Sequence, residues 1–316
     1  MSSSDASATP PLNRISIVES KEDDLSFEAA PTVDDASDPL SFTFASPATP
    51  FEYPSLSGEN AARWSKWGLF GTGGGRLVRL AVVRGGREPS AAPDAFLRDL
   101  FASPSLRAEL PVLSRTEPGG AVTFRALRTD AATLDLFEPL FEAGALRRGS
   151  DGTAFIQGRL EESYNGLSIV HDAREALCLP ADGDPDGEDP SGDAEALVQP
   201  NRYGGVFTAG QRNEALFSIG RWVVAGGGMC QYEDVWAPYA GAIKDIARDV
   251  LAVVRTAGGG GEAEGVIRVV SSAWKVTAVD GVNLWPDQNP HNTCLVFADP
   301  VRRIVHVLYS PFLPWC

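Results

Sequence analysis

The sequence Gly226-Gly-Gly-Met-Cys-Gln-Tyr-Glu-Asp-Val-Trp-Ala-Pro-Tyr239 separates two helical patterns and decides how the C-terminal half folds. The glycines at 226–228 end the first pattern, because glycine readily adopts the left-handed conformation that closes a helix. Pro238 favours the first turn of the next helix. Between these signals lie a thiol, an amide, a phenol and two carboxylates. The stretch is therefore either a demanding helix junction or a functional site.

Helical patterns lie on both sides of this stretch. Thr208 and Gln211 have the spacing of a capping box, which predicts a helix that starts there and runs through Trp222 to the glycines. A second helix is predicted from Pro238, with apolar residues at helical spacing as far as Val254. We expect these two helices to form a pair.

Four strand patterns follow the helix pair, at Val266–Val270, Trp274–Val279, Thr293–Phe297 and Ile304–Tyr309. The turn sequence Asp299-Pro300 predicts that the last two pair as a hairpin. Earlier in the chain, strands are predicted at Leu77–Val83 and Ala121–Leu127, and helices at Pro93–Phe101 and, interrupted or kinked by Pro139, at Asp130–Ala143. Helices followed by consecutive antiparallel strands predict an α+β fold, with helices packed on a largely antiparallel sheet.

The acidic charge is concentrated in two segments. The formal net charge is −15, yet residues 1–38 carry nine acids against two bases, and residues 180–196 carry seven acids and no base. Both segments have few large apolar residues, so we expect a disordered acidic tail at 1–38 and a disordered insertion at 180–200. The rest, 39–316, is interpreted as a single α+β domain, with its helix pair and antiparallel strands at 205–310. Its charge is nearly balanced, which argues against nucleic-acid binding.

The cysteines and the hydropathy suggest a reduced compartment. The sequence has no apolar run long enough to span a membrane, and its polar, acidic N-terminus resembles no signal peptide. We therefore interpret the four cysteines, at 178, 230, 294 and 316, as reduced thiols of a cytosolic protein.

Two short patterns resemble a phosphate-binding loop and a metal site, but both lack the features that such sites need. Gly71-Thr-Gly-Gly-Gly75 is followed by a predicted strand, whereas a dinucleotide-binding loop is followed by a helix. His291 and Cys294 have metal-like spacing but no second ligand pair. His291 is expected at the surface, and no cofactor or metal is predicted.

Cys230 is the best candidate nucleophile. Neighbouring glycines and a helix N-terminus would lower the pKa of its thiol, and the base would have to be His171, His291 or His306. His306 lies in a strand pattern and is expected to be packed or solvent-facing. The alternative, which we favour, is that Cys230 is a small buried residue at a tight junction.

The polar residues after Cys230 predict contacts rather than chemistry. Asp234 is interpreted as the N-cap of the following helix. Gln231, Tyr232 and Glu233 have no such local explanation. We expect them to form a contact surface, or a buried polar network with Arg302 and Arg303.

The motifs at 227–235, Pro238-Tyr239, Ser271-Ser272, Lys275-Val276 and 299–309 together resemble the cilia- and flagella-associated protein 300 family over about residues 205–310. Weaker similarity extends back to about Trp64, whereas the acidic tail and insertion depart from the family pattern. The resemblance implies a protein of the cytoplasm and the axoneme of motile cilia. It implies a role in the assembly of outer and inner dynein arms, with axonemal dynein subunits and a kintoun-like preassembly factor as partners. It implies no catalytic residues.

Three functions remain open at this point. The first is a non-enzymatic factor that acts by protein–protein binding in dynein-arm assembly or delivery. The second is an enzyme or small-ligand module centred on Cys230, and the third is a stable structural subunit of the axoneme.

Overall fold

The computed structural model describes residues 41–47, 51–71, 74–85, 88–164, 167–179, 201–227, 231–256, 266–285, 289 and 291–313. The predicted acidic tail and the predicted insertion lie outside these residues, so both stay predictions, as does the division of the chain at residue 38. The described elements form an α+β fold, as the sequence predicts.

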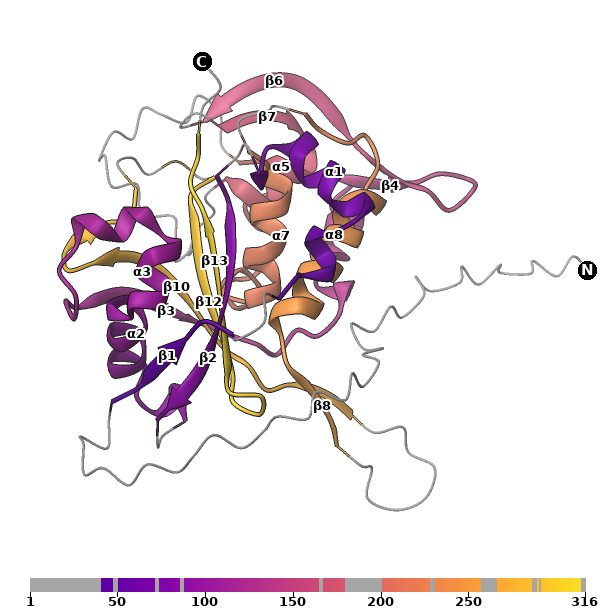
Figure 1. Ribbon diagram of the computed structural model, residues 1–316. Coiled ribbons are helices and arrows are strands. Elements are labelled where there is room, and N and C mark those ends of the chain that lie inside the picture. Colours follow the sequence, from indigo (N-terminus) through magenta and orange to yellow (C-terminus); the bar gives the residue numbers. More distant parts are fainter. Residues whose placement is uncertain are drawn as a thin grey trace, which may run out of the picture.

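A seven-stranded sheet organises the described part of the chain (Figure 1). Its strands follow the order β1, β2, β13, β12, β10 and β11, with β3 also paired to β10, and all registered pairs are antiparallel. The strands are β1 (Thr43–Ala45), β2 (Arg76–Arg84), β3 (Val122–Leu127), β10 (Ser272–Val279), β11 (Val282–Asn283), β12 (Thr293–Asp299) and β13 (Ile304–Ser310). The predicted hairpin of the last two is confirmed, with Phe297 opposite His306.

Helices cover both faces of this sheet (Figure 1). On one face pack α2 (Pro93–Ala102), α3 (Pro104–Glu109) and the short 3-10 helix η4 (Pro111–Arg115). On the other pack α1 (Glu59–Trp67), α5 (Asp172–Cys178), α7 (Ala215–Ala225) and α8 (Ala237–Val250). Strand β12 contributes to the cores on both faces of the sheet. Phe297 belongs to the core on the α7–α8 side, and Val296 belongs to the core on the α2–α3 side. This is why every residue of β12 and β13 is buried.

Smaller elements complete the fold. Three two-stranded sheets are formed by β4 (Leu146–Arg148) with β5 (Ala154–Ile156), β6 (Gly158–Tyr164) with β7 (Leu167–His171), and β8 (Val253–Thr256) with β9 (Val266–Val269). The remaining helices are short: η1 (Pro54–Leu56), η3 (Pro89–Ala91), η5 (Leu134–Phe137), α4 (Pro139–Glu142) and α6 (Ala209–Arg212).

The structure refines the predicted helix boundaries in three places. The helical pattern expected at 130–143 is interrupted at Pro139, which is one of its two expected forms: it is shorter than expected and consists of η5 and α4, because Pro139 starts a new helix. The helix expected from Thr208 is also divided: the predicted capping box is present, but α6 ends at Arg212, before α7 begins. Val254 lies in β8 and not in α8, which ends at Val250.

Candidate functional site: the α7–α8 junction

The junction begins where α7 ends at Gly226, whose φ of 67° lies in the left-handed region. The next residue, Gly227, donates its backbone N–H to the carbonyl oxygen of Trp67 at 2.8 Å. A Cβ atom on Gly227 would lie 1.9 Å from the carbonyl oxygen of Gly68. The end of α1 therefore approaches the junction so closely that only glycine fits at 227. Residues 228–230, and with them Cys230, lie outside the described residues.

Residues 234–236 continue the junction as an extension of the β4–β5 hairpin. Ile156 donates its backbone N–H to the carbonyl of Asp234 at 2.8 Å, and Trp236 donates to the carbonyl of Ala154 at 2.8 Å. Between these bonds, Phe155 and Val235 form an antiparallel bridge. The chain thus stays extended up to Trp236, which is the N-cap of α8 and makes no side-chain cap. The prediction that Asp234 caps α8 is wrong, because strand pairing holds this residue before the helix.

Glu233 joins the junction to α1. Its Oε1 atom accepts hydrogen bonds from the indole of Trp67 at 3.0 Å and from Nζ of Lys66 at 2.6 Å. Its backbone N–H donates to the hydroxyl of Tyr239, 3.2 Å away, and the ring of Tyr239 stacks on Trp67. Sequence patterns gave no role to Glu233, because its partners are about 165 positions away.

Arg302 and Arg303 lie elsewhere, in the turn between β12 and β13. The carboxylate of Asp299 accepts the backbone N–H groups of Val301 and Arg302, and it pairs with the guanidinium of Arg302 at 4.0 Å. Arg303 donates to the carbonyl of Gly85. The predicted network that joins Glu233 to these two arginines is therefore wrong: the Glu233 side chain bonds Lys66 and Trp67, whereas the arginines bond Asp299 and Gly85.

Tyr232 covers a buried arginine. The guanidinium carbon of Arg174 lies 4.3 Å from the centre of the Tyr232 ring, and Arg174 is fully buried. Its Nε donates to the carbonyl of Val224 and its Nη1 to that of Ser168, whereas its Nη2 has no hydrogen-bond partner in the described part. A cation–π contact thus takes the place of a carboxylate. Gln231, the other predicted residue, is exposed.

The three histidines are all buried, and each has a structural partner. Nδ1 of His171 accepts the N–H of Arg174 and caps α5. Nδ1 of His291 lies 2.6 Å from the carbonyl of Gly226, so the prediction of a surface histidine is wrong. Nδ1 of His306 lies 2.9 Å from the hydroxyl of Tyr53, and His306 is packed. Burial is the main cause that lowers the pKa values of His171 to about 3, of His291 to about 4 and of His306 to about 3.

The two described cysteines are buried and free. Burial raises the pKa of the Cys178 and Cys294 thiols, which disfavours the reactive thiolate. Within the described ranges, no group of three or more histidine, cysteine or acidic side chains could hold a metal ion. None of the described helices is long and apolar enough to cross a membrane.

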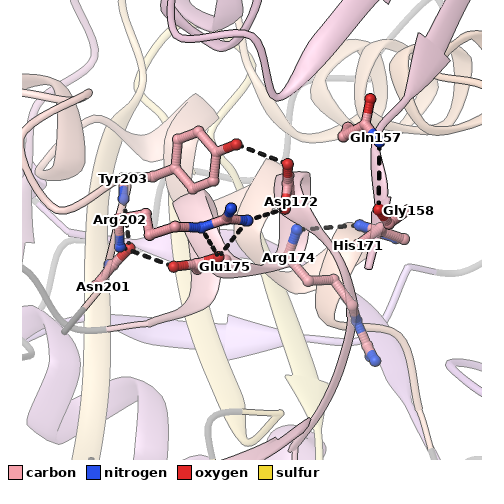
Figure 2. Close-up of polar contacts among 9 residues, drawn as sticks. All are labelled: Gln157, Gly158, His171, Asp172, Arg174, Glu175, Asn201, Arg202 and Tyr203. Carbon is pink, nitrogen blue, oxygen red and sulfur yellow. Dashed lines mark hydrogen bonds and ion pairs between the residues drawn. The ribbon is translucent and has the colours of Figure 1, made fainter. Parts of the chain in front are cut away.

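A second polar cluster, which we call the acid clamp, consists of Asp172, Glu175, Arg202 and Tyr203 (Figure 2). Arg202 donates to Asp172 at 2.6 Å and lies 3.4 Å from Glu175, and the hydroxyl of Tyr203 donates to Asp172 at 2.6 Å. The backbone N–H of Arg202 also donates to Glu175. Figure 2 shows that the neighbouring Arg174 points away from both acids.

The acid clamp joins the two ends of the predicted insertion. Asp172 and Glu175 belong to α5, which ends just before residue 180, and the two other members follow residue 200. The local charge pattern of the sequence does not reveal this cluster, because Asp172 and Arg202 lie on either side of the insertion, whose acids dominate that pattern. The sequence does contain one signal for the cluster. Asp172 and Glu175 are three positions apart before the polar insertion, and Arg202 follows soon after it.

One face of the junction is exposed. In the hairpin extension, Arg147 is opposite Phe155 and Phe155 is opposite Val235, so the three side chains share a face. The Phe155 side chain is 46% exposed, and Arg147 is exposed beside it. We call Arg147, Phe155 and Val235 the junction row. Gln231 and Asp234, also exposed, are near it in the chain.

These features define a class of protein: an α+β protein in which the described polar clusters brace distant parts of the chain. The cilia- and flagella-associated protein 300 family model matches residues 196–310, which include the whole junction. The resemblance to this family is therefore confirmed.

Two curated relatives carry the same name, Cilia- and flagella-associated protein 300. The one from Chlamydomonas reinhardtii is 26% identical over 282 residues, which cover 84% of this chain and 98% of the relative. The one from Paramecium tetraurelia is 26% identical over 223 residues, which cover 70% of this chain and 76% of the relative. No solved structure matches the chain.

Proposed function

We propose that this protein is a non-enzymatic factor of cilia and flagella that acts by protein–protein binding in the assembly or delivery of outer and inner dynein arms. Its partners would be axonemal dynein subunits and a kintoun-like preassembly factor, and it would act in the cytoplasm and the axoneme. The observation that carries the ciliary part is the family match over residues 196–310. Both relatives have names that place them with cilia and flagella.

The junction supports a binding role. Glu233 bonds both Trp67 and Tyr239, and these two rings stack on each other. These contacts fix the backbone beside Val235 of the junction row. A rigid surface loses little conformational entropy when a partner binds. Aromatic and arginine side chains are enriched at the centres of protein interfaces, and Phe155 and Arg147 are of these types.

Gene deletion in a flagellated cell tests the proposal. We expect the mutant to form cilia of normal number that lack outer and inner dynein arms in cross-section. Expression of the wild-type protein should restore the arms. Normal arms in the deletion strain would contradict the proposal.

A pair of surface variants tests the junction row. Phe155→Asp should abolish rescue, whereas Val83→Asp should rescue fully. Val83 is a matched control, because it is an apolar residue of a strand with 52% exposure. Equal rescue by both variants, at equal protein levels, would show that the function does not need the junction row.

The two alternatives have their own tests. If Cys230 carries a reaction, Cys230→Ala should fail to restore motility, and the thiol should react faster than a free peptide thiol at neutral pH. We expect rescue and ordinary reactivity. A structural subunit of the axoneme would resist extraction by high salt, whereas we expect an assembly factor to be extracted.

A further inference from the structure

A hollow of about 350 Å³ lies at the end of the main sheet, away from the junction. Its apolar lining comes from five residues of β2, β12 and the segments beside them: Phe42, Val82, Pro89, Ala298 and Pro300. The volume is at the low end of the range for ligand pockets. It suits one or two apolar side chains better than a large cofactor.

Among the described residues that line the hollow, Arg303 is the one cation. Arg303 is exposed, and its guanidinium donates to the carbonyl of Gly85 but has no carboxylate partner among the described residues. The carboxylate of Asp299 is already occupied by the turn that precedes Arg303. Glu88, another charged residue of the lining, is exposed. An occupant with an apolar side chain next to a carboxylate would match Arg303.

The N-terminal segment of this chain reaches the described structure at the hollow. Phe42 lines the hollow, and its backbone N–H is held by the carboxylate of Asp99 at 2.8 Å. Upstream, Asp23-Asp-Leu-Ser-Phe-Glu28 combines two apolar side chains with three acids, and Phe27 is the single aromatic residue of residues 1–38.

We propose that the segment 23–28 binds in the hollow, with Leu25 and Phe27 against the apolar lining and an acidic side chain at Arg303. The 12 residues from 29 to 40 connect this segment to the described structure. A flexible linker of this length has a root-mean-square span of about 20 Å. A tether of this kind gives an effective concentration in the millimolar range, so even a weak site is occupied by its own tail. The proposal does not rest on the ciliary function.

A competition experiment tests the proposal. The probe is a fluorescein-labelled peptide of residues 20–31, and binding is followed by fluorescence anisotropy. The receptor is the full chain with Leu25→Ser and Phe27→Ser, whose own tail no longer competes. We expect saturable binding to this receptor and apparent binding about ten-fold weaker to the wild-type chain, because there the tail fills the hollow.

Three changes locate the binding site. Phe27→Ser in the peptide should weaken binding at least ten-fold, because a buried aromatic side chain supplies most of the affinity. Arg303→Asn in the receptor should weaken it about three-fold, as for an exposed ion pair. Asparagine is chosen because Arg303 has a φ of 54°, which asparagine tolerates. Glu88→Lys should strengthen binding about three-fold.

Two results would overturn the proposal. The first is equal binding of the peptide to the wild-type and the tail-altered chains, which would mean that the hollow is open and takes a separate partner. The second is the absence of saturable binding up to about 1 mM peptide, the weakest affinity that the tether could use. If Arg303→Asn fails to fold, an unchanged affinity with Glu88→Lys contradicts the predicted site.

Discussion

The guanidinium of Arg202 lies 2.6 Å from Oδ1 of Asp172, although the arginine side chain is 55% exposed and the aspartate side chain only 4%. An exposed cation thus satisfies a buried carboxylate, and the same cation lies 3.4 Å from the equally buried Glu175. A buried charge is stable only when it is paired and hydrogen-bonded. The cationic side chain of the acid clamp lies at the end of the predicted insertion, beside the hydroxyl of Tyr203 that also donates to Asp172.

Replacement of Arg202 should destabilise the folded protein. We expect Arg202→Met to lower the free energy of unfolding by about 3 kcal/mol, because it removes the cation that pairs with the buried carboxylate of Asp172. Arg248→Met is the control: Arg248 pairs with Asp245 at 3.9 Å on the exposed surface of α8. Such pairs contribute less than about 0.5 kcal/mol. Urea denaturation measures both, and equal losses would show that the acid clamp is no more than a surface pair.

Two substitutions of Glu233 distinguish the effect of its charge from the effect of its hydrogen bond to Trp67. Glu233→Gln keeps an oxygen that can accept the indole N–H of Trp67, and it loses only the charge opposite Lys66, a side chain that is 43% exposed. We expect a loss of at most about 1 kcal/mol. Glu233→Arg removes the acceptor and places a cation beside Lys66, so we expect a loss of about 3 kcal/mol. Thermal unfolding of the two variants distinguishes the roles. Similar melting temperatures would show that the indole bond does not hold α1 to the junction.

His171 makes stability depend on pH. Its pKa in the folded protein is lowered to about 3, mainly by burial and also by Arg174. In the unfolded chain its pKa is about 6.5, so below pH 6.5 the unfolded state binds a proton that the folded state does not. Stability is therefore lost as the pH falls from about 6.5 toward 3, at up to about 1.4 kcal/mol per pH unit for this residue.

The variant His171→Asn isolates this contribution. Asparagine keeps a side-chain acceptor for the N–H of Arg174 at the start of α5, and it does not titrate. We expect the free energy of unfolding, measured in urea between pH 6.5 and 4.5, to fall less steeply by about 1.4 kcal/mol per pH unit. His291 and His306 retain their own contributions in the variant. An unchanged slope would mean that His171 is protonated in the folded state.

The elements with strong local signals could be predicted from the sequence. Pro93 begins α2 and Gly226 ends α7, because proline and glycine act through their own backbones. The role of Asp234 was not predictable in the same way, since its extended conformation depends on pairing with β5, about 80 positions earlier. The acid clamp was hidden for the same reason. Its bonds connect α5 to residues beyond the insertion, and no local pattern contains both ends.

The packing of α7 against η5 leads to a last prediction, which concerns two helical glycines. A Cβ atom at Gly220, in α7, would lie 2.4 Å from Cζ of the buried Phe137, whereas at Gly241, in α8, the nearest atom would be 3.8 Å away on Arg63. Alanine is favoured over glycine inside a helix by about 1 kcal/mol. Gly241→Ala should therefore raise the free energy of unfolding by about 0.5–1 kcal/mol.

Gly220→Ala should lower the free energy of unfolding instead, by about 1–3 kcal/mol, because the clash with Phe137 outweighs the helical preference. The double variant Gly220→Ala with Phe137→Leu should recover part of the loss, since the smaller side chain frees the space that the new methyl group needs. Calorimetric melting of the three variants measures these changes. If Gly220→Ala and Gly241→Ala raise the melting temperature equally, α7 does not pack on Phe137 at the distance described here.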